Sequence, residues 1–138
     1  PIKTIRVSVG KAGTETPTGT WTMHRAGRWQ ELMGPSWGQY GTHVVNGIFV
    51  HSVACGQANS YNLPVGEYLR LGNPASHGCI RACVADAKWV WDNCNGSKIH
   101  IFDGTYTSNE ALKGPLGRKA LTPLRGSKNF DPTDPACK

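Results

Sequence analysis

One cysteine and one histidine stand out as residues that could do chemistry together. Cys79 lies in the segment Ser76–Arg81, whose sequence is SHGCIR, and His51 ends an apolar stretch upstream. A thiol becomes a useful nucleophile when a neighbouring base takes its proton, and imidazole suits that exchange near neutral pH. We therefore predict nucleophilic catalysis by Cys79, with His51 as the general base.

The residues beside Cys79 supply further parts of such a site. Gly78 permits a sharp turn, so the N–H groups of Gly78 and Cys79 can converge on an oxyanion just before a helix begins. His77 is the poorer base, because in an extended segment its side chain points away from that of Cys79. The alternative is a structural thiol, since free cysteines are often buried.

Hydrophobic periodicity predicts the elements that position these residues. Alternation predicts a strand over Ile2–Val9, and β-branched and aromatic residues predict a second strand over Thr16–Met23. Asn46 and Gly47 stand between two apolar runs, which predicts a hairpin over His43–His51 with a type I′ turn. The hairpin places His51 at the end of a strand.

The remaining segments are one helix, one strand and three irregular stretches. Apolar spacing predicts a helix over Val84–Cys94, and Lys98–Phe102 is predicted to be a short strand. Residues 25–40 are predicted to form an ordered loop rather than a helix. Residues 54–76 are predicted to form a long irregular connection, and such a connection in a compact domain is often functional. Residues 103–138 are rich in Gly, Pro and Lys, and this composition predicts a C-terminal tail without a core of its own.

Composition limits the class of protein. The 138 residues suit one domain, and 17 Gly with 9 Pro favour short strands joined by turns over a helical bundle. No apolar run reaches the ~18 residues of a membrane span. The net charge of +6 suits an anionic cell wall or a carboxylate-bearing peptide. The basic residues form no stripe, so nucleic acid is not an expected partner. We expect a mainly β domain over residues 1–102, with the tail 103–138 packed on it.

Five cysteines are a high and odd number for a chain of this size. Cys83 and Cys94 lie on the same predicted helix roughly 16 Å apart, beyond disulfide reach. We therefore expect Cys55 to pair with Cys83 or Cys94, Cys137 to pair with the remaining one, and Cys79 to stay free. Five reduced thiols are the alternative.

Four sequence blocks follow one another in a recognisable order. They are Ser8–Lys11, Thr16–Thr20, His51–Ser52, and the SHGCIR motif with Leu71–Ala75 before it and Asp86–Val90 after it. In this order they resemble the bacterial L,D-transpeptidases (the YkuD-type catalytic domain) over about residues 4–102, and four ordered blocks are more specific than one motif. The resemblance implies a β-sandwich or open barrel with one short helix after the cysteine motif. It also implies no cofactor, no metal, and an extracytoplasmic location at the cell wall.

The activity that the resemblance implies is acyl transfer on peptidoglycan stem peptides. The cysteine attacks the carbonyl of the third, L-configured diamino acid, expels the terminal D-Ala, and passes the acyl group to an amine of a neighbouring stem in a 3→3 cross-link. Water as the acceptor gives an L,D-carboxypeptidase instead. Carried over by position, Cys79 is the nucleophile and His51 is the proton donor and acceptor, with Ser52 and His77 as residues that orient the catalytic groups. The N–H groups of Gly78 and Cys79 form the oxyanion hole, which Tyr40 assists. Ser76 and Arg81 bind the substrate. Arg81 is equally suited to a structural salt bridge.

This sequence departs from the family pattern in two places. The connection from His51 to Ser76 is longer than usual, and its extra length falls in Cys55–Arg70, which is either a lid over the acyl pocket or a surface insertion. Family domains also open with a further strand or two before Ile2, so part of the sheet is expected to be missing.

Three other functions remain as alternatives to a transpeptidase. A thiol peptidase of another family would use the same Cys79 and His51 with water as the acceptor. A secreted, disulfide-stapled module that binds the wall would use all its cysteines structurally. We expect the chain to be a monomer. A zinc site of His77, Cys79, Cys83 and Cys94 is disfavoured, because the ligand spacing is poor.

Overall fold

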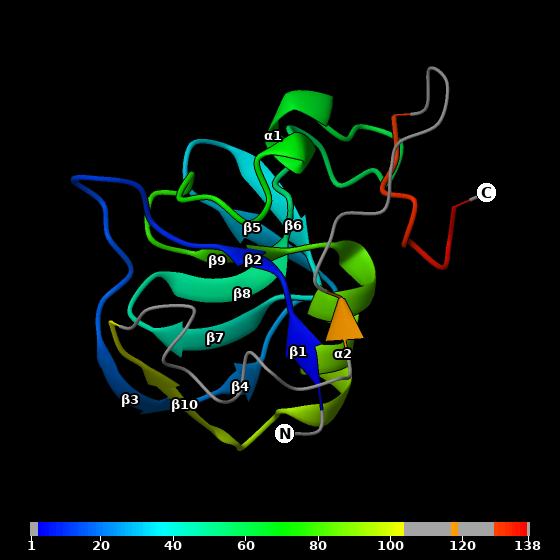
Figure 1. Ribbon diagram of the computed structural model, residues 1–138. Helices are drawn as coiled ribbons and strands as arrows, with labels where there is room; N and C mark the ends of the chain where they lie inside the picture. The colour runs from blue at the N-terminus through cyan, green and yellow to red at the C-terminus, as the bar shows by residue number, and fades with distance from the viewer. Residues whose placement is uncertain (1–2, 104–116, 119–128, 138) are drawn as a thin grey trace.

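A computed structural model describes residues 3–103, 117–118 and 129–137. Most of the predicted tail therefore lies outside the described residues. The elements, in chain order and labelled in Figure 1, are β1 (Thr4–Ile5), β2 (Val7–Ser8), β3 (Gly19–Thr22), β4 (His24–Arg25), β5 (Trp29–Leu32), β6 (Ser36–Gln39), β7 (Thr42–Val45), β8 (Ile48–Ser52), α1 (Val65–Leu69), β9 (Ile80–Ala82), α2 (Val84–Asn93), β10 (Lys98–Ile101) and β11 (Gly117–Arg118).

A five-stranded mixed sheet with the order β2-β9-β8-β7-β4 forms the centre of the fold. Its neighbouring strands are antiparallel except β8 and β9, which run parallel with Val50 opposite Ile80 and His51 opposite Arg81. The other strands form the pairs β3–β10, β5–β6 and β1–β11. The predicted mainly β class is confirmed, and the parallel pair brings the two candidate catalytic segments side by side.

The main core lies where α2 packs against the sheet, as Figure 1 shows. Alternate residues of the strands and one face of α2 supply its buried members, which are Met23, Val44, Val50, Ile80 and Val90. The predicted helix Val84–Cys94 forms as Val84–Asn93, with Cys83 and Cys94 as its two caps. Because the helix follows β9 directly, its packing fixes the strand that leaves the SHGCIR motif.

The predicted hairpin forms, and its turn differs in type. β7 and β8 pair with Val45 opposite Ile48, which leaves Asn46 and Gly47 as the two turn residues. Asn46 has a φ of 50°, whereas Gly47 is not among the residues with a positive φ. A type I′ turn needs a positive φ at both positions, so that part of the prediction was wrong.

Two predicted loops contain regular structure. Residues 25–40 carry the β5–β6 hairpin, in which Trp29 lies opposite Gln39 and Leu32 opposite Ser36. Residues 54–76 contain the helix α1, and their residues Leu63, Tyr68 and Leu71 pack with Val53 and Cys83 in a second buried cluster. A segment that buries its own cluster in this way is held by packing, because removing such side chains from water is favourable. It is a compact insertion and does not behave as a bare loop.

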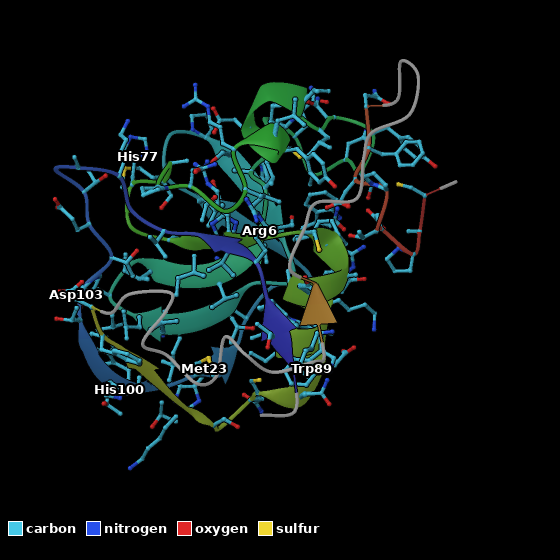
Figure 2. All side chains as sticks on the ribbon, viewed as in Figure 1. Arg6, Met23, His77, Trp89, His100 and Asp103 are labelled. Atoms are coloured by element: carbon cyan, nitrogen blue, oxygen red, sulfur yellow. The ribbon has the colours of Figure 1, made fainter. Side chains whose placement is uncertain are left out.

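The predicted first strand is split at Arg6. β1 pairs with β11 and β2 pairs with β9, so the chain changes neighbours between them. Arg6 Nε donates a hydrogen bond to the carbonyl of Leu71 at 3.1 Å, and Figure 2 shows Arg6 at the junction of the two strands. The second predicted strand is shorter than expected, because only Gly19–Thr22 pairs with β10.

The expected disulfides are absent, since all five cysteines are unbonded in the structure. The Cys55 thiol donates to the Val53 carbonyl at 3.6 Å, and the Cys83 thiol donates to the Asp86 carboxylate at 3.2 Å. Cys83 and Cys94 cap opposite ends of α2. Burial raises the pKa of Cys55 and of Cys83 to about 11, so both are buried, protonated thiols.

Residues 129–137, drawn in orange-red in Figure 1, pack between the insertion and α2. Asn129 accepts a hydrogen bond from the Leu63 N–H at 2.9 Å. Asp131 accepts from the Val84 N–H at 2.8 Å and Thr133 from the Ala85 N–H at 3.1 Å, which supplies the side-chain cap that Cys83 does not give to α2. No helix within the described ranges is long and apolar enough to cross a membrane.

Candidate active site

The parallel pair β8–β9 gathers the candidate catalytic side chains on one face. Side chains along a strand alternate, so Phe49 and His51 point to the same side of β8. Cys79 immediately precedes β9 and shares a side with Arg81, which lies opposite His51 in the register. The intervening residues Val50 and Ile80 point the other way, into the core. The sequence thus places a thiol, an imidazole and a guanidinium on one surface.

A pocket of about 450 Å³ opens on this surface. Its floor comes from β8, β9 and the SHGCIR segment, which contribute Phe49, His51, Cys79 and Arg81 among others. One wall comes from the β5–β6 hairpin, through Glu31, Leu32, Met33 and Ser36. Met33 at the hairpin tip is 82% exposed, so this wall projects into solvent.

His51 is held in one tautomer. Its Nδ1 forms a short hydrogen bond with the carbonyl oxygen of Ser52. A carbonyl can only accept, so Nδ1 carries the proton and Nε2 is the basic nitrogen. The ring is 2% exposed, and burial lowers its pKa to about 4, with the Ser52 bond opposing and the Arg81 charge adding to the shift. His51 is therefore neutral, and ready to accept a proton, at neutral pH.

Cys79 is a protonated thiol at rest. Its Sγ accepts a hydrogen bond from the Phe49 N–H at 3.4 Å and donates to the Gly47 carbonyl at 3.5 Å. Burial raises the pKa of the Cys79 thiol, while the Phe49 bond and the nearby Arg81 charge partly oppose that rise. Cys79 and His51 line the same pocket, but no hydrogen bond joins the thiol to the imidazole among the described residues. A thiol with a raised pKa needs a base at the moment of attack.

The segment that carries Cys79 is fixed by hydrogen bonds within itself and to residues 10–16. Ser76 Oγ donates to the Cys79 carbonyl at 2.6 Å and accepts from the Gly78 N–H at 3.1 Å. Thr16 Oγ1 donates to the Gly78 carbonyl at 2.7 Å, and Thr14 Oγ1 donates to the Ser76 carbonyl at 2.9 Å. These threonines fall in or beside the sequence block 16–20, which was the available signal for a supporting role.

Glycine is the one residue type that fits at position 78. Its φ is 126°, and a Cβ built there would stand 2.7 Å from Ile48 Cδ1. An L side chain would be both strained and obstructed. The predicted convergence of the Gly78 and Cys79 N–H groups is met only in part, because the Gly78 N–H is already bonded to Ser76 Oγ.

Arg81 forms the salt bridge that one of its two interpretations required. Its Nη1 donates to Glu67 of α1 at 2.9 Å, and only 14% of its side chain is exposed. The Arg81 Nε is buried and has no hydrogen-bond partner among the described residues. The insertion thus reaches the site through Glu67, whereas none of its residues from 55 to 70 lines the pocket. In this structure the insertion does not cover the pocket.

The other predicted site residues fall into different places. Ser52 is buried, and its carbonyl orients His51 as the prediction required. His77 lines the pocket but is exposed, and Figure 2 shows it at the edge of the molecule. Ser76 uses its hydroxyl within the motif. Tyr40 does not line the pocket: its ring is buried between the Arg28 guanidinium, at 4.1 Å, and Trp91, at 5.4 Å.

Sequence reasoning missed the residue that packs behind the imidazole. Gly38 of β6 lies so close to His51 that a Cβ built on it would stand 2.7 Å from Nδ1. A side chain there would displace the ring. Gly38 sits in a stretch predicted as a loop, and nothing in its sequence surroundings signals the contact. Within the described residues, no group of three or more His, Cys, Asp or Glu is arranged to hold a metal ion.

The lowered pKa of His51 makes stability depend on pH. The unfolded imidazole has a pKa of ~6.5, whereas the folded one is about 4, so the unfolded state binds the extra proton between these values. The contribution of the neutral His51 to the free energy of unfolding is fully present above pH ~6.5. The free energy of unfolding falls by about 3 kcal/mol as the pH drops through this window. We expect urea unfolding at pH 7 and at pH 4.5 to show a loss in the wild type that is larger than the loss in His51→Gln. Equal losses would contradict the buried, neutral imidazole.

Comparison with known proteins identifies a matching family and a related protein. The family model of the L,D-transpeptidase catalytic domain, YkuD, matches residues 1–115. A stretch of 27 residues is 59% identical to YciB of Bacillus subtilis (strain 168), and it covers 20% of this chain and 14% of that protein.

Solved structures share the fold. An L,D-transpeptidase from Mycobacterium tuberculosis H37Rv has a TM-score of 0.56 and 23% identity, over 72% of this chain and 42% of that one. L,D-transpeptidase 3 from Mycobacterium tuberculosis, solved with a faropenem-derived adduct, has a TM-score of 0.51 and 22% identity, over 72% of this chain and 44% of that one. The chain spans less than half the length of these proteins. The likeness confirms the predicted β-sandwich architecture.

Proposed function

We propose that this chain, which belongs to the family of L,D-transpeptidase catalytic domains, uses Cys79 to transfer an acyl group between peptidoglycan stem peptides. The thiol attacks the bond between the L-diamino acid and D-Ala of a tetrapeptide stem, D-Ala leaves, and an amine of a second stem takes the acyl group. The product is a 3→3 cross-link. The family acts on the cell wall, so we also propose an extracytoplasmic location.

One observation carries the proposal. A protonated thiol, a neutral imidazole with a fixed tautomer and a guanidinium line the same open pocket, on two parallel strands in register. This is the set that acyl transfer by a thiol needs: a nucleophile, a base and a cationic group at the site of attack.

In the first half-reaction, His51 Nε2 takes the proton of the Cys79 thiol as the sulfur attacks the carbonyl carbon. The negative charge moves to the carbonyl oxygen, and we assign its stabilisation to the Cys79 N–H, because the Gly78 N–H would first have to leave Ser76 Oγ. Collapse of the tetrahedral intermediate breaks the C–N bond. The leaving amine of D-Ala takes the proton back from His51, and a thioester on Cys79 remains.

In the second half-reaction, an amine attacks the thioester and gives its proton to His51. The thioester C–S bond breaks, the sulfur recovers the proton, and the free thiol is restored. Water would follow the same path and yield a tripeptide, which is the L,D-carboxypeptidase alternative. For Arg81 we propose a bound substrate carboxylate as a second partner beside Glu67, reached through the unpartnered edge of its guanidinium.

The structure disfavours the non-catalytic alternative, a module stapled by disulfides. All five cysteines are free thiols, so the staples on which that reading rested are missing.

The experiment is to incubate the protein with disaccharide-tetrapeptides and follow the products by mass spectrometry. We expect loss of the mass of D-Ala together with formation of a cross-linked dimer. Tripeptide without dimer would identify water as the acceptor. No release of D-Ala under conditions where the protein remains folded would overturn the proposed function.

A further inference from the structure

A buried hydrogen-bond chain begins in residues 129–137 and ends at His51. These residues lie beyond the 1–115 range of the family match. Asp134 is 3% exposed, although it lies far along the chain from the catalytic strands. A buried carboxylate must be hydrogen-bonded to be tolerated, so its partners indicate what it serves.

The partner of Asp134 is Gln39 of β6. The Gln39 Nε2 donates to Asp134 Oδ2 at 3.0 Å, and its Oε1 accepts from Arg28 Nη1 at 2.8 Å. The second oxygen of Asp134 accepts from the Ala136 N–H at 2.9 Å. The Gln39 amide is thereby held at both ends, once by a cation and once by an acidic group, and bonds to charged groups are the stronger kind.

Gln39 in turn holds the backbone around His51. Its N–H donates to Ser52 Oγ at 2.8 Å, and the Ser52 carbonyl is the acceptor of His51 Nδ1. Gly38, the residue before Gln39, packs against the imidazole at Nδ1. The backbone of residues 38–39 is therefore both the wall behind the ring and the anchor of the residue that fixes its tautomer.

From these contacts we infer that Asp134 is a positioning residue for His51, acting through Gln39 and Ser52. Loss of the Asp134 carboxylate frees one end of the Gln39 amide, and residues 38–39 can then shift away from the ring. The imidazole is then no longer held in the single orientation set by the Ser52 carbonyl, and proton transfer slows. The inference builds on the proposed function in taking His51 as the base.

The same segment provides a matched control. Thr133 Oγ1 accepts from the Ala85 N–H at 3.1 Å and binds Asp131, so it ties residues 129–137 to α2 without touching Gln39. Thr133→Val therefore loosens the segment at its other attachment. If residues 129–137 served stability alone, Thr133→Val and Asp134→Ala would have the same consequences at equal loss of melting temperature.

The experiment compares Asp134→Ala, Gln39→Met and Thr133→Val, each at a temperature where it is folded. For D-Ala release from a disaccharide-tetrapeptide we expect kcat to fall about tenfold in Asp134→Ala and in Gln39→Met, with KM within about twofold of the wild type, because a buried hydrogen bond that positions the base is lost. The double variant is expected to be no slower than either single one, since both break the same contact. Thr133→Val should retain the wild-type kcat.

A second measurement does not depend on turnover. The ring nitrogens of His51 are observed by NMR as the pH is lowered. In Asp134→Ala we expect the pKa of His51 to rise from about 4 toward its ordinary value as water reaches the ring, while Thr133→Val leaves it unchanged. An unchanged kcat and an unchanged His51 titration in Asp134→Ala would overturn the inference. A wild type that releases no D-Ala would overturn the proposed function instead, and the NMR comparison would still decide the role of Asp134.

Discussion

Cys79→Ala is expected to lower the rate of D-Ala release at least about 10³-fold and to abolish the covalent adduct with faropenem. The thiol is the nucleophile of the proposed mechanism, and no neighbouring group replaces it. Ser76 also lines the pocket, but its hydroxyl is bound within the motif. The alanine variant should fold, because the thiol makes only two long sulfur contacts, to Phe49 N and Gly47 O. Intact-protein mass spectrometry gives the number of adducts per chain.

Cys94→Ala is the matched control for this experiment. Cys94 caps the far end of α2 and does not line the pocket. We expect the control to retain its rate within about twofold and to form one adduct, on Cys79. An adduct that persists in Cys79→Ala, or one that disappears in Cys94→Ala, would contradict the assignment of the nucleophile.

His51→Gln is expected to lower kcat/KM for D-Ala release by about 10²- to 10⁴-fold, the range of a lost general base. The reason lies in the two pKa values. Burial raises that of the Cys79 thiol and lowers that of His51 to about 4, so thiol and imidazole are both neutral at pH 7. The attacking thiolate is not formed in advance, and it must be made by transfer to the imidazole.

The pH profile separates this mechanism from a preformed thiolate. In the wild type we expect kcat/KM to be level near neutral pH and to fall only as His51 is protonated, near pH 4. In His51→Gln the residual rate should rise with pH, because the thiol must then ionise by itself. Parallel profiles in the two proteins would show that His51 is not the base. Cys83→Ala, which removes a buried thiol outside the pocket, serves as the control for nonspecific effects.

The sequence was sufficient to predict the hairpin that carries His51 and the helix that follows the cysteine motif, but not the strand β9, which carries Arg81. The hairpin ending in His51 and the helix α2 have strong local signals, namely Asn46-Gly47 between apolar runs and a spaced apolar face. The β5–β6 hairpin has no such local sequence signal. Its strands, Trp29–Leu32 and Ser36–Gln39, contain Gln, Glu, Ser and Gly, and their pairing depends on burial against β8 rather than on local preference.

The missed parts of the site depend on contacts between distant segments. Gly38 behind the imidazole and Asp134 on Gln39 act across long stretches of chain, and no spacing rule links them to His51. The cysteine pairing failed for a related reason. An odd count suggested disulfides, but Cys55 and Cys83 each bury their thiol against a local acceptor, which only the fold reveals. Tyr40 was placed by resemblance alone, and core packing removed it from the pocket.

The parallel pairing of β8 and β9 has a consequence for how this domain can evolve. Antiparallel neighbours joined by a tight turn change register when one residue is inserted, whereas parallel neighbours need a long crossover whose length leaves the register untouched. The chain between Ser52 and Ile80 can therefore gain or lose whole turns of helix without moving Cys79 relative to His51. Insertions such as the one carrying α1 are best tolerated in this connection, because lengthening a loop costs little closure entropy. Such insertions can change the substrate preference, because they lie close to the reacting atoms.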